Sequence, residues 1–454
     1  MSRFLLILIV TSLITRFLFF IFLAPWQSEV ENAIILHSDA LGYHKIATTI
    51  LQFHHFAVNR YEPSSLHHVP IYPLFLSIIY YVFGVHPWIV LVIQIFLSTG
   101  ACILFYFTLR TLVPENAAKY AALFFAVNPF LIMFSNALLT DVLFGCVLVV
   151  LMYFSTKILI NNINKEHISH IIFSAIFCGA AALLRPIAVY LPILVLAFLL
   201  YKFKSQFVHA LGYSLMFIVV FLFTISPWLI RNYRISGSLV FSTSGAYNLL
   251  VLNVTPFEMN KRKLPADTVK AQLLKEADSL MIVNRLNPYT ENDYQKSIYW
   301  QQVAYHYISE NKSTFIKYYC LGMVQTFTNL ASATAAEMLQ LSSPDEHLDI
   351  KAHPNVFEMI LLGLKQKSGG EIFIGVVIAL YLLFTYLCLF TGLYVLKFND
   401  NRLLFLFYLS IIFYFVILTG AGGLARFSLP AIPFYLVFCG VGLSHWITKF
   451  RQRK

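Results

Sequence analysis

Long apolar runs follow one another along most of the chain, and their length predicts transmembrane helices. About 20 apolar residues in a helix cross the roughly 30 Å hydrocarbon core of a bilayer. The runs do not alternate polar and apolar residues as barrel strands do. We predict ten spans, at about 4–24, 87–110, 119–135, 138–158, 168–184, 187–201, 208–229, 371–396, 402–419 and 427–448. The predicted fold is an all-α polytopic membrane protein with about ten, and at most twelve, transmembrane helices.

Two longer and more polar segments separate these spans. The first, 24–86, contains an apolar stretch at 71–83 that is too short to span and is typical of an interfacial helix. The second, 231–370, has helical periodicity over 264–286 and 290–331. We therefore divide the chain into an N-terminal transmembrane catalytic module, an extracytoplasmic loop region and a set of C-terminal transmembrane helices, with bounds 1–230, 231–370 and 371–454.

Composition and charge agree with a membrane protein. Hydrophobic residues make up 59% of the chain and charged residues only 12%, against about 25% charged in soluble domains. The net charge of +11 comes from short basic clusters between apolar runs, which mark cytoplasmic loops and do not indicate nucleic acid. This rule predicts both termini inside. A span at 314–335 would move the basic tail outside, so we predict that this stretch is a helix that lies along the outer surface or packs in the outer region.

Isolated charged residues recur at the predicted outer ends of the spans. Asp39 follows the first span, Asp141 begins the fourth, and Arg185, Arg231 and Arg426 lie at the ends of later spans. Guanidinium groups bind phosphate, and a carboxylate can act as general base for an alcohol or amine. The pattern predicts a reaction on a phosphate-bearing substrate in the membrane.

Each of these residues also has a structural interpretation. The arginines could anchor helix ends in lipid headgroups or occupy an exposed turn, and the two aspartates could begin helices at 39 and 141. The histidines at 54, 55, 67 and 68 lack the spacing of metal ligands and are more typical of interfacial polar residues. The sequence indicates no cofactor. Two carboxylates could share a divalent metal, but no ligand cluster requires one.

A resemblance to a known family rests on five segments of the chain, 37–47, 68–73, 184–186, 227–233 and 425–430. They resemble segments of polytopic GT-C glycosyltransferases, most closely glycosyltransferase family 39, which includes protein O-mannosyltransferases and the aminoarabinose transferases that modify lipid A. The resemblance implies a polyprenyl-phosphate sugar donor and inverting transfer on the outer face. The acceptor would be a lipid, glycan or protein, as in lipopolysaccharide or protein glycosylation.

The resemblance also implies roles for particular residues. Asp39 matches the catalytic base of the family, and Asp141 matches a second acidic residue that orients the base or binds the acceptor. The residues expected to bind the lipid phosphate or the sugar are Tyr43, His68, Tyr72, Arg185, Arg231 and Arg426. Relatives commonly carry an arginine shortly before the Pro-x-Tyr-Pro stretch, whereas this chain has histidines at 67 and 68.

Two other functions share some of these features. A transporter or flippase of polyprenyl-linked saccharides would also need many spans and charged residues, but a carrier usually binds its substrate near the midplane, between repeats of the fold. A polymerase of lipid-linked saccharides would share the donor class. Among these functions we prefer the transferase, in a bacterial inner membrane with its active site on the extracytoplasmic side.

Overall fold

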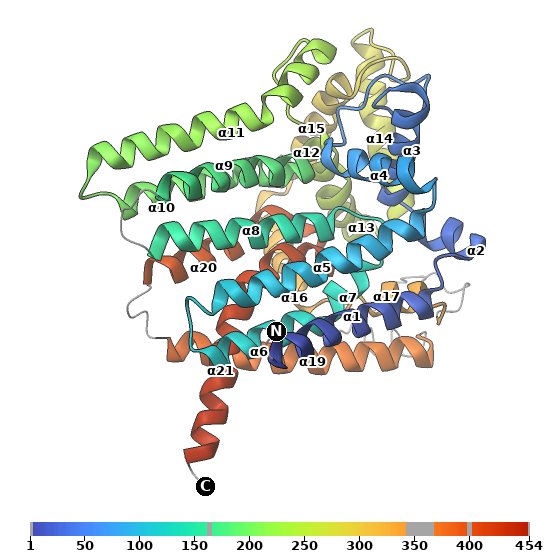
Figure 1. The fold of residues 1–454 in the computed structure, drawn as a ribbon. Coiled ribbons are helices and arrows are strands. Elements are labelled where there is room, and N and C mark those ends of the chain that lie inside the picture. Colours follow the sequence, from blue (N-terminus) through green and yellow to red (C-terminus); the bar gives the residue numbers. More distant parts are fainter. Residues whose placement is uncertain (1–2, 161–165, 342–366, 397–401, 453–454) are drawn as a thin grey trace.

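The computed structural model describes residues 3–160, 166–341, 367–396 and 402–452, and every regular element in these ranges is a helix (Figure 1). The long helices are α1 (Arg3–Leu23), α5 (Pro87–Leu109), α6 (Glu115–Ala126), α7 (Pro129–Ser135), α8 (Asp141–Ile160), α9 (Glu166–Leu184), α10 (Leu191–Lys202), α11 (Phe207–Ser236), α19 (Gly369–Val395), α20 (Arg402–Thr419) and α21 (Ile432–Gln452), with the shorter α7 included because it continues α6. Short 3₁₀ segments join them at η2 (Pro186–Tyr190), η4 (Gly420–Gly422) and η5 (Ala425–Ala431).

The remaining helices belong to the two polar segments. The first holds α2 (Ser28–Val30), the π-helical turn η1 (Glu31–Ile35), α3 (Asp39–Phe53) and α4 (Ile71–Phe83). The second holds α12 (Ser244–Asn248), η3 (Leu249–Val254), α13 (Thr255–Arg262), α14 (Ala266–Val283), α15 (Asp293–Glu310), α16 (Lys312–Thr328) and α17 (Ser332–Met338). In Figure 1 the helices α2 to α4 and α12 to α15 gather at the right-hand end of the long helices.

The predicted membrane helices are confirmed within the described ranges. Eight helices are long and apolar enough to span a bilayer, and there are nine if α6 and α7, which meet at an angle of 47°, form one broken span. The span predicted at 119–135 is interrupted in the structure, because Asn128 and Pro129 end α6 and begin α7. The predicted span at 187–201 consists of the 3₁₀ turn η2 and the short helix α10.

The long helices pack as a row of neighbours. α11 packs on α9, α9 on α8, α8 on α5 and α5 on α1, while α21 packs against α6 and α19 (Figure 1). Glycines bring α21 unusually close to its neighbours. A Cβ at Gly392 would lie 1.9 Å from the Phe438 carbonyl oxygen, and one at Gly442 would lie 2.0 Å from the Cys388 carbonyl oxygen. Such small residues allow helix backbones to approach closely in a membrane.

The second polar segment has a hydrophobic core of its own. Its buried residues are Leu250, Val254, Phe257, Val269, Leu273, Ala277, Val303, Ala304 and Phe315. The helix predicted at 264–286 is confirmed as α14. The helix predicted at 290–331 is interrupted: α15 ends at Glu310, α16 ends at Thr328, and α17 follows. α16 is not among the candidate spans, as predicted for 314–335. Part of the predicted loop region, 342–366, lies outside the described residues.

Candidate functional site

The site begins where the first polar segment turns into α3. Ser38, just before the helix, has φ 53° and ψ −127°, a conformation that costs a non-glycine residue of order 1–3 kcal/mol and is typical of functional sites. Asp39 is the first residue of α3, and its side chain is 57% exposed. Its carboxylate pairs with an arginine from the other end of the chain, so Asp39 does more than begin a helix.

Four predicted site residues form one chain of ion pairs. Arg426 Nη1 donates to Asp39 Oδ2 at 2.9 Å, and Arg426 Nε donates to Asp141 Oδ2 at 2.8 Å. Arg185 Nη1 donates to the other oxygen, Asp141 Oδ1, at 2.8 Å. The order Asp39–Arg426–Asp141–Arg185, which we call the ion-pair chain, joins two carboxylates and two guanidinium groups from distant parts of the sequence.

Local sequence explains where these groups lie. Arg185 follows α9 directly and precedes Pro186, which disfavours continuation of the helix at the residue before it. Arg426 lies in η5, which is reached through a turn with positive φ at Gly420 (73°) and Gly423 (57°). Asp141 is the first residue of α8, and its side chain is only 2% exposed. The buried Asp141 thus fixes both arginines, while Asp39 is open to solvent.

The charges of the ion-pair chain determine the protonation of Asp39. Burial by itself would raise the pKa of this carboxyl, but the positive charge of Arg426 and its hydrogen bond outweigh that effect. The pKa of Asp39 therefore lies below its ordinary value, and the residue is ionised near neutral pH.

Tyr43, His68 and Tyr72 form an aromatic cluster. The Tyr43 ring makes edge contacts with His68 (5.3 Å between centroids) and Tyr72 (5.0 Å). Tyr72 is fully buried and donates its hydroxyl to Gln94 Oε1 at 3.0 Å. Burial raises the pKa of Tyr43 to about 12 and lowers the pKa of His68 to about 3, with nearby His67 adding to the second effect. His68 is thus neutral at physiological pH and supplies no fixed positive charge.

Arg231 lies apart from the ion-pair chain. Its guanidinium covers the rings of Trp228 (4.4 Å) and Phe56 (5.0 Å). Its Nη1 donates to the Ser65 carbonyl oxygen and to Asn232 Oδ1, both at 2.8 Å. The structure therefore places Arg231 as a link between α11 and the first polar segment and does not bring it into contact with Asp39.

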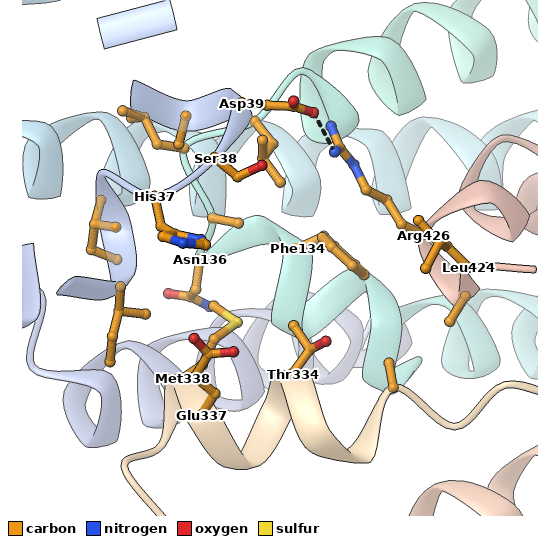
Figure 2. Close-up of a pocket in the computed structure, with 18 of the residues that line it drawn as sticks. His37, Ser38, Asp39, Phe134, Asn136, Thr334, Glu337, Met338, Leu424 and Arg426 are labelled. Carbon is orange, nitrogen blue, oxygen red and sulfur yellow. Dashed lines mark hydrogen bonds and ion pairs between the residues drawn. The ribbon is translucent and has the colours of Figure 1, made fainter. Parts of the chain in front are cut away.

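A cavity of about 270 Å³ lies beside Asp39 (Figure 2). Its lining residues are Ile34, Ile35, His37, Ser38, Asp39, Ala40, Phe134, Asn136, Ala137, Leu138, Leu139, Asn329, Ala331, Thr334, Glu337, Met338, Leu424, Ala425 and Arg426. The lining does not include Tyr43, His68, Tyr72 or Arg231. In Figure 2 the Asp39 carboxylate points toward Arg426, and α17 carries Thr334 and Glu337 on the opposite side of the cavity.

Sequence reasoning missed the wall that α17 provides. Glu337 is exposed, and its carboxylate makes no hydrogen bond or ion pair with another side chain or backbone group of the described residues. Its sequence signal was weak: one acidic residue in a short run of small residues, 332–338, at the end of a moderately apolar stretch. Only the fold brings Glu337 to the cavity that Asp39 lines.

In the described ranges no group of three or more His, Cys, Asp or Glu side chains lies close enough to hold a metal ion. Both aspartates of the ion-pair chain are bonded to Arg426. The chemistry available here consists of a half-exposed carboxylate, two arginines and a cavity with both apolar and polar walls.

Comparisons with known proteins agree with this architecture. Residues 67–230 match the family model described as dolichyl-phosphate-mannose-protein mannosyltransferase. No curated protein matches the chain. Among solved structures, the oligosaccharyltransferase AglB from Archaeoglobus fulgidus in complex with an inhibitory peptide and a dolichol-phosphate aligns over 97% of this chain and 51% of its own, with 14% identity and a TM-score of 0.52.

Two further solved structures are similar. The Archaeoglobus fulgidus oligosaccharyltransferase in complex with zinc and sulfate aligns over 99% of this chain and 50% of its own, with 15% identity and a TM-score of 0.53. ArnT from Cupriavidus metallidurans bound to undecaprenyl phosphate aligns over 97% and 76%, with 13% identity and a TM-score of 0.45. This chain spans about half the length of the oligosaccharyltransferase. The predicted all-α polytopic fold is confirmed: it resembles the fold of the two oligosaccharyltransferase structures, and the family model matches residues 67–230.

Proposed function

We propose that this protein is a membrane glycosyltransferase that moves a sugar from a polyprenyl-phosphate donor to a lipid, glycan or protein acceptor. The observation that carries the proposal is the half-exposed Asp39 carboxylate, which lines a cavity and is held at 2.9 Å by Arg426. In this proposal Asp39 accepts the proton of the acceptor hydroxyl while the oxygen of that hydroxyl attacks the anomeric carbon of the sugar. The bond from that carbon to the lipid phosphate breaks on the opposite face.

Arg426 and Arg185 are suited to the leaving phosphate. A lipid phosphate leaves readily only if its developing charge is stabilised, and guanidinium groups in a poorly hydrated site do this strongly. Asp141 uses both oxygens to hold these two arginines. Its proposed role is therefore to orient them, and the role of base is assigned to Asp39.

Donor binding would then activate the base. Arg426 lowers the pKa of Asp39 in the free protein, which keeps the carboxylate ionised but makes it a weaker base. A phosphate that pairs with Arg426 would compete for the guanidinium and partly cancel its charge. The pKa of Asp39 would rise, and the carboxylate would become a stronger base when the donor is present.

The acceptor would approach from the α17 side of the cavity. Thr334 and Glu337 offer hydrogen-bonding groups there, while Leu138, Leu424 and Met338 provide an apolar surface. We therefore assign Glu337 to acceptor binding. Arg231, which packs on Trp228 and Phe56, has no direct contact with substrate in this proposal.

The proposed location is a bacterial inner membrane, with the cavity on the extracytoplasmic side. The eight candidate spans support an integral membrane protein. The ion-pair chain lies where helices begin or turn, at the first residues of α3 and α8 and in the turns after α9 and η4, whereas carriers usually bind substrate near the midplane.

Purified protein in nanodiscs can test this function. A panel of radiolabelled undecaprenyl-phosphate hexoses and pentoses is offered with lipid, glycan and peptide acceptors, and both labelled product and released undecaprenyl phosphate are measured. We expect release with the wild type and a loss of about 10³-fold in kcat with Asp39→Asn, within the range for removal of a general base.

Asp267→Asn is the matched control, because Asp267 is an exposed carboxylate in the first turn of α14, a helix that contributes no residue to the cavity. It should leave the rate unchanged. Movement of intact labelled lipid across the bilayer without release of lipid phosphate would contradict the proposal and favour a carrier. Full activity in Asp39→Asn would exclude Asp39 as the base.

A further inference from the structure

The first membrane helix carries a charged residue that takes no part in the ion-pair chain. Arg16 lies in the middle of the candidate span α1, and its side chain is fully buried. Charged groups at such depth are costly and usually functional. Nε donates to Ser98 Oγ at 3.0 Å, and Nη1 donates to Ser12 O at 3.1 Å, Ser12 Oγ at 3.0 Å and Ala126 O at 2.9 Å, all of them neutral oxygens. Nη2 is buried and has no hydrogen-bond partner among the described residues. No carboxylate of the described residues pairs with it.

The partner Ala126 is the last residue of α6, just before the 47° bend into α7. A helix that ends inside a membrane leaves carbonyl groups that water cannot reach, so other groups must satisfy them. All four last carbonyls of α6 have partners: Leu123 O with Val127 N (3.1 Å), Phe124 O with Tyr381 Oη (2.9 Å), Phe125 O with Asn128 N (3.4 Å), and Ala126 O with Arg16 Nη1 (2.9 Å) and Thr15 Oγ1 (3.3 Å).

The other side of the bend is satisfied as well. Asn128 Oδ1 accepts from the amides of Phe130 and Leu131, each at 3.0 Å, and thereby caps α7. Pro129 has no amide hydrogen to satisfy. The positive charge of Arg16 also lies at the C-terminal end of α6, where the helix dipole is negative. Arg16 thus places a cation on the last carbonyl of α6.

The bend leads directly into the candidate site. Phe134 and Asn136, at the end of α7, line the cavity beside Asp39. Asn136 Nδ2 also donates to the backbone oxygen of Arg16 at 3.3 Å, which ties the end of α7 back to α1. Asp141, the centre of the ion-pair chain, lies only five residues further along. A change in the direction of α7 would therefore move one cavity wall and the start of α8.

We propose that Arg16 is a positioning residue: by holding the Ala126 carbonyl at the end of α6, it sets the bend into α7 and thereby places Asn136 and Asp141 at the active site. The link to activity rests on the proposed glycosyltransferase function. The effect on the bend does not depend on that function.

Two measurements on the full-length protein in nanodiscs test this inference. Hydrogen exchange followed by mass spectrometry reports on the amides of 130–136. We expect Arg16→Met to speed their exchange at least tenfold, with no change in peptides from α9. In the transfer assay with undecaprenyl-phosphate sugars, kcat per folded molecule should fall about tenfold. The unfolding temperature should also fall, because the buried oxygens that accept from Arg16 lose a hydrogen-bond donor. Arg16→Lys should recover part of the change in exchange and in kcat, because it keeps the positive charge and one donor nitrogen.

The matched control is Thr156→Val, which removes another buried hydrogen bond, between α8 and Tyr408 of α20. It should leave exchange in α7 and kcat unchanged. If Arg16→Met does not fold, Arg16→Lys and Thr15→Val carry the same test with smaller expected effects. Unchanged exchange of 130–136 in the folded variants would overturn the inference. If the wild type transfers no sugar but Arg16→Met still speeds amide exchange in α7, the proposed function fails and the assignment of the bend to Arg16 stands.

Discussion

Two arginines that look alike in the sequence have different surroundings in the structure. Arg231 and Arg426 both lie next to predicted spans, and both were predicted to bind a lipid phosphate. Arg426 pairs with two carboxylates and lines the cavity. Arg231 packs over two aromatic rings and donates to a backbone carbonyl and an amide oxygen.

The difference shows that position along a span does not decide what a guanidinium does. Arg426 has its charge balanced by carboxylates that an incoming phosphate could displace, so it remains available for an anion. The partners of Arg231 are a carbonyl, an amide and ring faces, which stabilise a fixed arrangement of α11 against the first polar segment. The region around Arg426 is therefore suited to catalysis, and the region around Arg231 is suited to structural support.

The largest effect that separates the two regions should come from neutralising each arginine. Arg426→Gln should lower kcat about 10²-fold or more, because it removes the proposed stabilisation of the leaving phosphate. Arg231→Gln should keep kcat within about threefold but reduce stability by about 1–3 kcal/mol, through loss of its ring contacts and its hydrogen bonds. Transfer rates and unfolding temperatures of the two variants, measured side by side, check the contrast.

The same pair of variants has a pH signature. Because Arg426 lowers the pKa of Asp39, removing its charge should raise that pKa and move the acid limb of kcat/KM to higher pH. Arg231→Gln should leave the acid limb in place. Equal losses of activity with equal pH profiles in both variants would contradict the distinction between the two regions.

Much of the fold followed from the hydrophobic pattern alone, because spans of about 20 apolar residues are signalled locally. The breaks were harder to predict. Asn128 and Pro129 interrupt a predicted span, and their sequence was a usable signal for a capped second helix. The break between α15 and α16 falls at Asn311, within a stretch whose helical periodicity continues across it.

The site was predictable only as a set of residue types. Asp39 and Arg426 are 387 positions apart, and nothing in either local sequence shows that they pair while Arg231 does not. The pairing depends on how α3, α8 and η5 pack. Glu337 was missed for the same reason, because a single acidic residue at the end of a short helix becomes informative only when the cavity is known.

A smaller effect should sharpen the assignment of the cavity walls. Glu337→Gln removes the charge but keeps the shape of the side chain that faces the cavity from α17. We expect the acceptor KM to rise about tenfold with little change in the donor KM, because the donor phosphate is assigned to Arg426 on the other side. Initial rates at varied donor and acceptor concentrations check this. A rise confined to the donor KM would place the acceptor elsewhere.

The smallest effect concerns stability and the buried His68. In the folded protein its pKa is lowered to about 3, mainly by burial, whereas an unfolded histidine titrates near 6.5. Between these values the unfolded chain binds a proton that the folded chain does not, so this residue makes stability fall as the pH drops from about 6.5 toward 3.

His68→Gln removes that proton uptake. The unfolding temperature of this variant should therefore decline less between pH 6.5 and 4.5 than that of the wild type, by a few degrees. An identical decline in wild type and His68→Gln would mean that His68 is protonated in the folded protein and could supply the positive charge that relatives place before the Pro-x-Tyr-Pro stretch.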